Sequence, residues 1–404
     1  MTDDGRTPAV TAFLPTTDQD VPNPMNAPRL ALLSLVLLLL TGSAMAQSMP
    51  VPSPPSLGAP SYILLDFESG NVLVEREADT PREPASLVKL MTAFVAFNEL
   101  EEGHLQLDEK VMISETAWRM GGSKMFVEVG KQVAVEDLLR GIIIQSGNDA
   151  SVAIAEHIAG NEQTFAQLMN NHAEEIGMYN TNFTNSTGWP DEAQTTTARD
   201  MALLAAAMIR NFPESYQYYS EREFTYNDIT QGNRNLLLTR DSSVDGLKTG
   251  HTSSAGYNLV SSAKRDDMRL VSVVMGTDGP RDRADQSQAL FNYGFRFFRS
   301  YALYEGNTEL ASPKLWKGAS DTIPVGLERT LYVTIPQREY ENLDANMRID
   351  SPVIAPVSRG DKLGEVTVKL DGEVIMEAPL IALEDGDTGG FFGSLVDEVL
   401  LFFQ

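Results

Sequence analysis

Three short polar motifs, separated by long stretches of chain, constrain the fold because their side chains are chemically useful together only if they meet. In chain order they are Ser86-Leu87-Val88-Lys89, Ser146-Gly147-Asn148 and Lys248-Thr249-Gly250-His251. The separations are 60 residues from Ser86 to Ser146 and 102 residues from Ser146 to Lys248. This order and spacing fit one cleft between a helical layer and the edge of a sheet. We therefore expect a single site built from three distant segments.

The first motif pairs a hydroxyl with an amine. Ser86 and Lys89 open a predicted helix three residues apart, so both side chains lie on one helical face. A serine hydroxyl is a weak nucleophile until a neighbouring base removes its proton. Lys89 can act as that base if burial and a nearby cation, for which Lys248 is the candidate, lower its pKa. Taken alone, the pattern also fits a capped helix start with a solvated lysine.

The second motif lies between two predicted helices. A turn at Gly147 could lift the side chains of Ser146 and Asn148 into a cleft. The alternative is a helix cap, in which Asn148 or Asp149 satisfies the first turn of the next helix.

The third motif precedes a strand rich in glycine and polar residues. Gly250 permits a substrate backbone to approach and pair along a strand edge, while Lys248 and Thr249 offer a charge and a hydroxyl to an anion. An exposed edge strand with a protective lysine is the alternative. We expect the side chain of His251 to be structural rather than a general base.

Composition excludes several classes of function. A formal net charge of −25 opposes any broad contact with nucleic acid. The absence of cysteine excludes disulfides, thiolate catalysis and cysteine metal sites, and the four histidines are not paired at metal-ligand spacing. We expect no metal and no cofactor. A Ser-His-Asp triad is disfavoured because the chain has no G-x-S-x-G element.

The N-terminus carries the pattern of an export signal. An apolar run at 30–40 is followed by Ala44-Met45-Ala46, which predicts a secretory signal cleaved after Ala46. A transmembrane anchor, the alternative, needs about 20 apolar residues. The acidic stretch before the run is abnormal for a signal peptide, so we expect translation to start at Met25.

The pattern of apolar residues and turn signals divides the rest of the chain into a part with both helices and strands and a β-rich part. Residues 47–60 form a proline-rich linker that we expect to be extended and to contribute nothing fixed to a core. Apolar periodicity then predicts one antiparallel sheet covered by helices, an α/β (α+β) fold, followed by a small all-β sandwich domain in which Asp371-Gly372 marks a hairpin. The predicted strands are 62–67, 72–75, 256–263, 268–275, 331–335, 365–370 and 373–376, and the predicted helices are 87–100, 133–144, 150–158, 164–176, 197–209 and 286–298. The predicted divisions are an N-terminal extension and signal peptide at 1–46, the linker, a catalytic domain at 61–298, the β domain at 299–386 and an amphipathic terminal helix at 387–404.

From Ser61 to its end the chain resembles the low-molecular-mass penicillin-binding proteins that act as serine-type D-alanyl-D-alanine carboxypeptidases. Beyond the three motifs, the likeness extends over Gly177-Met178-Tyr179-Asn180-Thr181, Ala198-Arg199-Asp200-Met201-Ala202-Leu203, Asn233-Arg234-Asn235, Val244 to Thr252, Ala255 to Val260 and Tyr293 to Phe298. The resemblance implies a penicillin-recognising, transpeptidase-like domain followed by a β-sandwich domain and a terminal helix.

The resemblance also implies a role for each motif residue. Ser86 is the acylated nucleophile and Lys89 its general base, while Ser146 passes a proton to the leaving D-alanine. The substrate-binding residues it implies are Asn148 for the peptide backbone, Lys248 for negative charge and for positioning Ser146, Thr249 near the terminal carboxylate, and Arg234 and Arg283 around that carboxylate. The N–H groups of Ser86 and His251 form the oxyanion hole. Arg281 is a neighbouring candidate for the role of Arg283, because the segment before it departs from the family pattern.

We therefore expect a hydrolase that removes the terminal D-alanine from peptidoglycan pentapeptides and is acylated by β-lactams. A β-lactamase is the nearest alternative, but it is disfavoured by Gly147 and by the lack of an E-x-x-L-N segment. A D,D-endopeptidase and, in a different class, a non-catalytic wall-binding scaffold remain alternatives.

The expected location is the periplasm, with peripheral attachment to the inner membrane through the terminal helix. The family's terminal helix is typically basic, whereas this chain has no Lys or Arg after Lys369. Attachment would then rest on apolar burial, so we expect it to be weak and nearly insensitive to salt. Docking of the helix on the β domain or on another subunit is the alternative.

Overall fold

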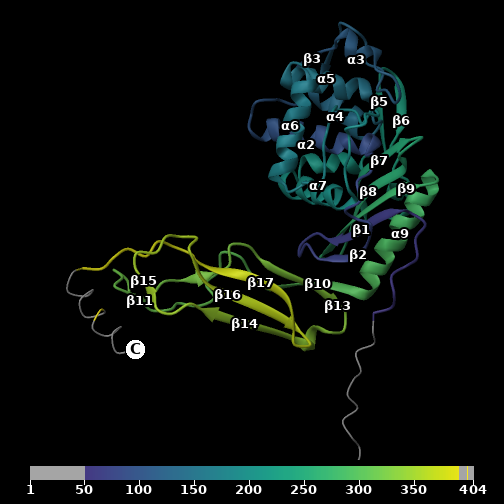
Figure 1. Cartoon of the computed structure of the whole chain (residues 1–404). Helices are drawn as coiled ribbons and strands as arrows, with labels where there is room; N and C mark the ends of the chain where they lie inside the picture. The colour runs from purple at the N-terminus through teal and green to yellow at the C-terminus, as the bar shows by residue number, and fades with distance from the viewer. Residues whose placement is uncertain (1–50, 391–397, 399–404) are drawn as a thin grey trace, which may run out of the picture. The chain divides into compact units, whose positions relative to one another are not determined.

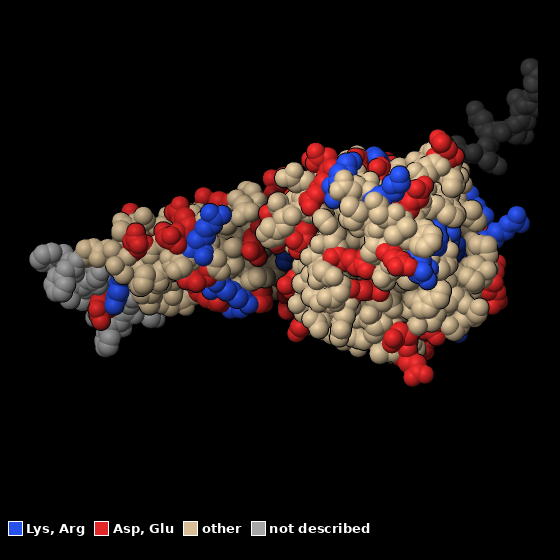
Figure 2. All heavy atoms as spheres, turned by 90° about the horizontal axis from the view of Figure 1, so that it is seen from above, with Lys and Arg blue, Asp and Glu red and all other residues tan. Residues whose placement is uncertain are grey.

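The computed structural model describes residues 51–390 and residue 398. The predicted export segment, its cleavage after Ala46 and the start at Met25 lie outside the described residues, as does most of the predicted terminal helix. Within the described part of the chain, no helix combines the length and the apolar character needed to cross a bilayer. Acidic side chains are spread over the face drawn in Figure 2, in keeping with the net charge of −25.

A five-stranded antiparallel sheet forms the centre of the first domain, with the strand order β2-β1-β9-β8-β7. Its strands are β1 (Ser61–Asp66), β2 (Val72–Arg76), β7 (Val244–Thr252), β8 (Gly256–Arg265) and β9 (Met268–Thr277). Because side chains alternate along a strand, Ile63 and Leu65 join one hydrophobic core while Tyr62 and Leu64 join another. The predicted strands 62–67, 72–75, 256–263 and 268–275 are found as β1, β2, β8 and β9, and they pair as the antiparallel hairpins β1–β2 and β8–β9.

Helices cover both faces of this sheet (Figure 1). One layer contains α2 (Val88–Glu101), α4 (Val135–Ile143), α5 (Asn148–Ala159), α6 (Glu162–Glu175) and α7 (Ala198–Asn211), and α9 (Pro280–Phe297) packs on the opposite face. Residues 88–97 of α2 are all buried, as expected for an apolar helix at the centre of a layer. The predicted sheet covered by helices is therefore confirmed.

Several short elements lie between the helices where apolar periodicity gives no signal. They are η1 (Ala85–Leu87), β3 (Lys110–Met112), α3 (Glu115–Arg119), β4 (Gln132–Ala134), η2 (Ser215–Ser220), β5 (Glu223–Tyr226), β6 (Ile229–Gly232) and α8 (Leu237–Arg240). The β5–β6 hairpin turns at Asn227 and Asp228, which both have a left-handed backbone, with φ of 47° and 59°. Each of its strands has four residues and none of these residues is fully buried, so the segment gives only a short apolar signal.

The expectation that residues 47–60 contribute nothing fixed to a core is wrong for their described part. Leu57 and Ala59 are buried in the hydrophobic core beside α9. Tyr293 and Gln286 of α9 hydrogen-bond to the backbone of this segment at 2.9 and 2.8 Å. A proline-rich chain is already extended and loses little entropy on binding, so a few contacts hold it along the helix.

The second domain is built only from strands and turns, apart from the single turn η3 (Tyr340–Asn342), as predicted. Its sheets have the orders β12-β17-β16-β14, β10-β13 and β11-β15. The strands are β10 (Phe298–Tyr304), β11 (Leu315–Trp316), β12 (Val325–Gly326), β13 (Leu331–Pro336), β14 (Leu343–Ile349), β15 (Val353–Ile354), β16 (Lys362–Leu370) and β17 (Glu373–Ala382). Val333, Val366 and Leu380 share its core. The predicted hairpin at Asp371-Gly372 is confirmed, with φ of 51° and 86°.

The start of the predicted terminal helix is different from the expectation. Residues 387–390 hydrogen-bond with the β domain through their backbone: the N–H of Ala319 donates to the carbonyl of Asp387 at 2.8 Å, and the N–H of Gly389 donates to that of Lys317 at 2.7 Å. Thr388 forms an antiparallel bridge with Gly318, and residues 387–390 are not helical. Apart from Glu398, the residues that follow lie outside the described part.

Candidate active site

Ser86 lies in the short 3₁₀ helix η1, which leads directly into α2. The preceding residue, Ala85, has a left-handed backbone with φ of 50°, which costs a non-glycine residue about 1 kcal/mol or more. Strain of this kind persists only where the surroundings enforce it. Gly188 belongs to those surroundings, because a Cβ atom at its position would collide with the carbonyl oxygen of Ala85. The backbone of the serine turn is therefore held by close packing.

Lys89 is fully buried, and its Nζ atom lies among three oxygen atoms. It is 3.3 Å from Oγ of Ser86 and 2.7 Å from Oδ1 of Asn148, and it also contacts the carbonyl oxygen of Thr187. The predicted pairing of Ser86 with Lys89 is thus present, and the second motif meets the first at the same amine.

The electrostatic environment favours the neutral form of this amine. Burial lowers the pKa of Lys89 to about 7, and the positive charge of Arg234 acts in the same direction. The carboxylates of Asp149 and Glu162 oppose this shift. Near neutral pH a substantial fraction of Lys89 is therefore unprotonated and able to accept the proton of the Ser86 hydroxyl.

Ser146 has a left-handed backbone, with φ of 61°, immediately before α5. Its side chain is buried, and its Oγ atom has no hydrogen-bond partner among the described residues. A buried hydroxyl without a partner is costly, and such groups need an explanation. A role in the reaction would be one such explanation.

Asn148 is the first residue of α5, but its side chain does not cap the helix. The N-cap is Gly147, which has no side-chain capping bond, so the alternative of a simple cap is wrong for Asn148. Its Nδ2 donates to the carbonyl of Gly121 at 2.7 Å and its N–H donates to that of Ser123 at 2.8 Å. These contacts orient Oδ1 toward Lys89.

The third motif lies on β7, the edge strand of the sheet beside η1. Lys248 and Thr249 are buried, and burial lowers the pKa of Lys248 well below its ordinary value, helped by the charges of Lys89, Arg234 and Arg283. At Gly250 a Cβ atom would lie 2.8 Å from the carbonyl oxygen of Pro84, so glycine lets β7 approach the serine turn.

The side chain of His251 is exposed and stacks on the ring of Tyr257, with a centroid distance of 3.9 Å. This contact agrees with the expected structural role of the imidazole.

The two predicted arginines occupy different environments. Arg283 is buried, and its Nη1 donates to the carbonyls of Gly250 at 3.0 Å and Asn258 at 3.3 Å, so it ties β7 to β8. Burial and the charge of Arg234 lower the pKa of Arg283 to about 10. Arg234 is an exposed residue whose guanidinium end is partly desolvated, which lowers its pKa. Arg281, the neighbouring candidate, is exposed.

Several residues of the site carry no motif that sequence reasoning recognises. The carbonyl groups of Gly121 and Thr187 act through the backbone, where residue type gives no signal. Glu162 accepts hydrogen bonds from the N–H and hydroxyl of Ser186 at 3.0 and 2.7 Å, and so holds the segment that carries Thr187. Asp149 directly follows the second motif, and this adjacency is the feature of the sequence that could have indicated its place in the site.

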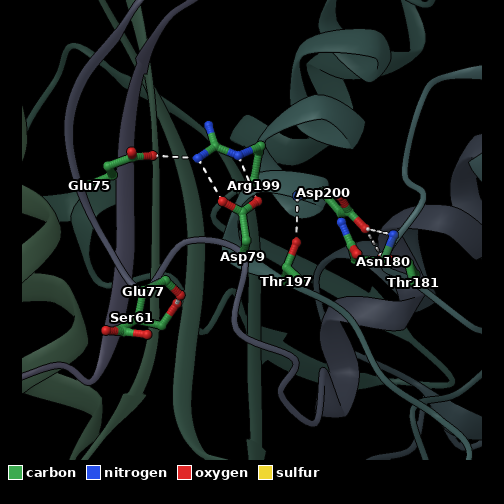
Figure 3. Close-up of polar contacts among 9 residues, drawn as sticks. All are labelled: Ser61, Glu75, Glu77, Asp79, Asn180, Thr181, Thr197, Arg199 and Asp200. Carbon is green, nitrogen blue, oxygen red and sulfur yellow. Dashed lines mark hydrogen bonds and ion pairs between the residues drawn. The ribbon is translucent and has the colours of Figure 1, made fainter.

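The family-like stretch around Arg199 and Asp200 is structural (Figure 3). Arg199 bonds to Asp79 at 2.7 Å and to Glu75 at 2.6 Å, joining α7 to β2 and to the segment after it. Asp200 accepts from the N–H of Asn180 at 2.9 Å and the hydroxyl of Thr181 at 2.6 Å. Neither network contacts the three motifs.

Among the described residues, one group has donors close enough to share a metal ion: Glu99, Glu102 and His104, whose ligand atoms lie within 4.8 Å of one another. Glu102 and His104 are exposed, and the His104 ring lies 3.2 Å from Glu99 and 3.3 Å from Glu102, as in ordinary surface contacts. None of these residues belongs to the three motifs.

Comparison with known proteins gives the same assignment along both domains. A family model described as D-alanyl-D-alanine carboxypeptidase matches residues 48–279, and a model described as penicillin-binding protein 5, C-terminal domain, matches residues 298–388. The D-alanyl-D-alanine carboxypeptidase DacA of Escherichia coli (strain K12) is 40% identical over 388 residues, which cover 93% of this chain and 96% of the relative.

Solved structures agree with the sequence relatives. Penicillin binding protein 5 from Haemophilus influenzae matches with a TM-score of 0.80 at 40% identity, covering 83% of this chain and 99% of that chain. Penicillin-Binding Protein D2 from Listeria monocytogenes, in its ampicillin-bound form, matches with a TM-score of 0.56 at 29% identity, covering 60% of this chain and all of that chain (100%). The resemblance inferred from the motifs is confirmed: the chain belongs to the D-alanyl-D-alanine carboxypeptidase family and is a serine-type carboxypeptidase of the penicillin-binding protein class.

Proposed function

We propose that Ser86 is the nucleophile of this carboxypeptidase and that neutral Lys89 is its general base. The observation that carries the assignment is the buried amine of Lys89, 3.3 Å from the Ser86 hydroxyl, with its pKa lowered to about 7. Lys89 accepts the hydroxyl proton as Ser86 Oγ bonds to the carbonyl carbon of the terminal peptide bond. The tetrahedral adduct collapses to an acyl-enzyme, and water then hydrolyses the ester and releases the shortened peptide.

The remaining residues are assigned to leaving-group protonation and to binding. Ser146 passes a proton to the nitrogen of the departing D-alanine, which its unpartnered, buried hydroxyl suits, and the proton that Lys89 took from Ser86 then restores the hydroxyl of Ser146. Lys248, buried on β7, stabilises negative charge near Ser146. The N–H groups of Ser86 and His251 form the oxyanion hole, where a donor is worth about 3 kcal/mol to the transition state.

The substrate lies along the edge of β7 in this proposal. Thr249 and Arg234 contact its terminal carboxylate, and Asn148 contacts its peptide backbone. Arg283 supports the carboxylate site with its charge and by holding β7 to β8. The glycine at 250 removes the side chain that would otherwise keep β7 away from the serine turn.

The physiological substrate proposed is a peptidoglycan pentapeptide ending in D-alanyl-D-alanine. A β-lactam offers the same features, an amide carbonyl and a carboxylate, to the same donors. We therefore propose that β-lactams acylate Ser86.

The proposed location is the periplasm, at the surface of the inner membrane. The apolar run at 30–40 followed by Ala44-Met45-Ala46 supports export. Domains at 61–298 and 299–386 then form the exported protein, and the apolar side chains within residues 391–404 provide attachment. Washing membranes that contain the full chain with high salt should leave it bound; release by salt would contradict apolar attachment.

Two substrates and two serine variants test the chemistry. Wild type, Ser86→Ala and the exposed control Ser312→Ala are incubated with a labelled pentapeptide and with a fluorescent penicillin. We expect wild type and Ser312→Ala to release D-alanine and to retain the label covalently, and Ser86→Ala to do neither. Label retained by Ser86→Ala would exclude Ser86 as the nucleophile, and no D-alanine from wild type would exclude the proposed substrate.

A further inference from the structure

The side chain of Asp149 has no role in the chemistry described above, yet it is buried beside it. Only 1% of this residue is exposed. Its carboxylate accepts four backbone N–H groups: Oδ1 accepts from Met125 at 2.8 Å and Ala150 at 3.0 Å, and Oδ2 accepts from Phe126 at 2.8 Å and Val127 at 3.2 Å. Three of these four donors belong to one segment, 125–127, which is distant in sequence. A buried carboxylate bound this way is a strong local anchor.

The segment that Asp149 binds is the one that orients Asn148. It continues the same stretch of chain, 121–127, in which Gly121 and Ser123 supply the carbonyl groups that accept from Nδ2 and the backbone N–H of Asn148, at 2.7 and 2.8 Å. Phe126 has φ of 71°, a conformation that a bulky residue adopts only when it is held there. The N–H of Phe126 is one of the groups that Asp149 binds.

Two glycines show how closely this segment approaches the second motif. A Cβ atom at Gly147 would lie 2.9 Å from Oδ1 of Asp149 and 3.0 Å from the backbone nitrogen of Met125. A Cβ atom at Gly122 would lie 2.8 Å from Nδ2 of Asn148. A side chain at the middle position of Ser146-Gly147-Asn148 would crowd the Asp149 carboxylate and the backbone that it binds, which explains the glycine there.

We propose that Asp149 is a positioning residue: its carboxylate fixes the segment 121–127 against the second motif, and this segment in turn fixes Asn148 with Oδ1 on the amine of Lys89. The inference rests on the proposed roles of Ser86 and Lys89. Without the anchor, the segment relaxes from its strained conformation, and Asn148 loses the two carbonyl groups that orient it. The base is then held less accurately, and acylation slows.

Asp149 also acts on Lys89 by its charge. The charged groups that act on the pKa of Lys89 are Arg234, Asp149 and Glu162, of which the two carboxylates favour the protonated amine. The amine of Lys248 is also nearby, and burial lowers its own pKa well below the ordinary value. Replacing Asp149 by asparagine removes one of the two carboxylates, so the pKa of Lys89 falls. Because the neutral amine is the base, the rise of the acylation rate with pH should move to lower pH.

The test compares Asp149→Asn, Gly147→Ala and the control Asp200→Asn. Asp200 is a matched residue, since it is a buried aspartate that accepts from a backbone N–H and a hydroxyl away from the site (Figure 3). Gly147 has φ of −62°, so alanine fits its backbone. The added Cβ atom would crowd the Asp149 carboxylate and the backbone nitrogen of Met125, and no charge changes. The second-order rate of acylation by a fluorescent penicillin is measured against pH, together with the unfolding temperature.

We expect Asp149→Asn and Gly147→Ala to acylate about 10²-fold more slowly than wild type, because a misplacement near 1 Å has that effect. The pH midpoint should fall in Asp149→Asn and stay unchanged in Gly147→Ala. Asp200→Asn should lose stability but keep the wild-type rate and midpoint.

Equal losses of rate in Asp149→Asn and Asp200→Asn, or a wild-type rate in Gly147→Ala, would overturn the proposal, as would an unchanged midpoint in Asp149→Asn. If Asp149→Asn fails to fold, the comparison of Gly147→Ala with Asp200→Asn decides the positioning claim. A wild-type protein that is not acylated at Ser86 would instead refute the proposed function, before any variant is compared.

Discussion

The amine of Lys89 and the amide oxygen of Asn148, 59 residues apart in the chain, lie 2.7 Å from each other inside the helical layer. This bond joins the first motif to the second, and Lys89 reaches Ser86 at the same time. The two motifs therefore form one hydrogen-bonded unit before any substrate binds. What remains adjustable is the protonation of the amine, which depends on the charges around it.

The pH dependence of acylation should report the pKa of Lys89. Since the neutral amine is the base, the rate should rise with pH and level off, with a midpoint near the pKa of about 7. Arg234 lowers this pKa, so Arg234→Ala should move the midpoint to higher pH, whereas Arg234→Lys keeps the charge and should leave it in place. Stopped-flow labelling with a fluorescent penicillin, repeated across the pH range, measures the midpoint for wild type and for each variant. A midpoint that moves down in Arg234→Ala would contradict the electrostatic account.

The turn at Ser86 should depend on glycine at position 188. Gly188 has φ of 80°, and a Cβ atom there would collide with the carbonyl of Ala85, so Gly188→Ala should displace the nucleophile and reduce acylation by about 10²-fold or more. Gly160→Ala is a matched control, because its φ is 77° but a Cβ atom meets nothing within 4 Å. It should lose about 1 kcal/mol of stability and keep its activity. Acylation rates and thermal unfolding distinguish the two; equal activity in both variants would show that the contact at Ala85 is unimportant.

How far the sequence could predict this structure depends on what carries the signal. The long helices were predictable because their apolar residues recur with a clear period, as in α7, and β9 was predictable as a short apolar run. β7, which carries the third motif, was not among the predicted strands. The three motifs were predictable as one site because their residue types are useful only together. The family assignment required more of the chain than these motifs.

Other parts of the structure were not predictable because they depend on backbone atoms or backbone conformations, which residue type does not reveal. The carbonyl of Thr187 contacts Lys89, but any residue type has a carbonyl. The left-handed backbones of Ala85 and Phe126 are held by tertiary contacts that local propensity does not contain. Leu57 is buried against α9 although its proline-rich surroundings indicate a free linker.

The ion pairs of Arg199 should contribute to stability and not to activity. Its partners Asp79 and Glu75 are exposed, so Arg199→Ala should cost about 1 kcal/mol or less, and less at high salt. The bond from Arg199 lowers the pKa of Asp79, so this contribution is present above the ordinary pKa of an aspartate and is lost as pH falls through the lowered value. Denaturant unfolding of the variant and wild type at about pH 7 and about pH 3 should show the difference shrinking. A reduced acylation rate in Arg199→Ala would contradict a purely structural role.

Arg283, rather than its neighbour Arg281, should be required for efficient reaction. Its Nη1 spans the carbonyls of Gly250 and Asn258, so it fixes the strand edge on which the substrate is proposed to lie. A charge-assisted hydrogen bond contributes about 1.5–3 kcal/mol, so Arg283→Ala should lower kcat/KM for the pentapeptide by about 10- to 100-fold. Arg281→Ala, at an exposed position, should stay close to wild type.

Arg283→Lys separates the two contributions of the guanidinium. Lysine keeps the positive charge but lacks the planar fork that reaches both strands, so it should recover only part of the lost kcat/KM. The measurement is the steady-state release of D-alanine by wild type and the three arginine variants, with KM and kcat determined separately. Full recovery in Arg283→Lys would assign the effect to charge alone, and a loss confined to Arg281→Ala would transfer the role to that residue. The partial recovery that we expect places the effect in the geometry of β7, because the substrate edge is then misaligned even though its carboxylate still meets a cation.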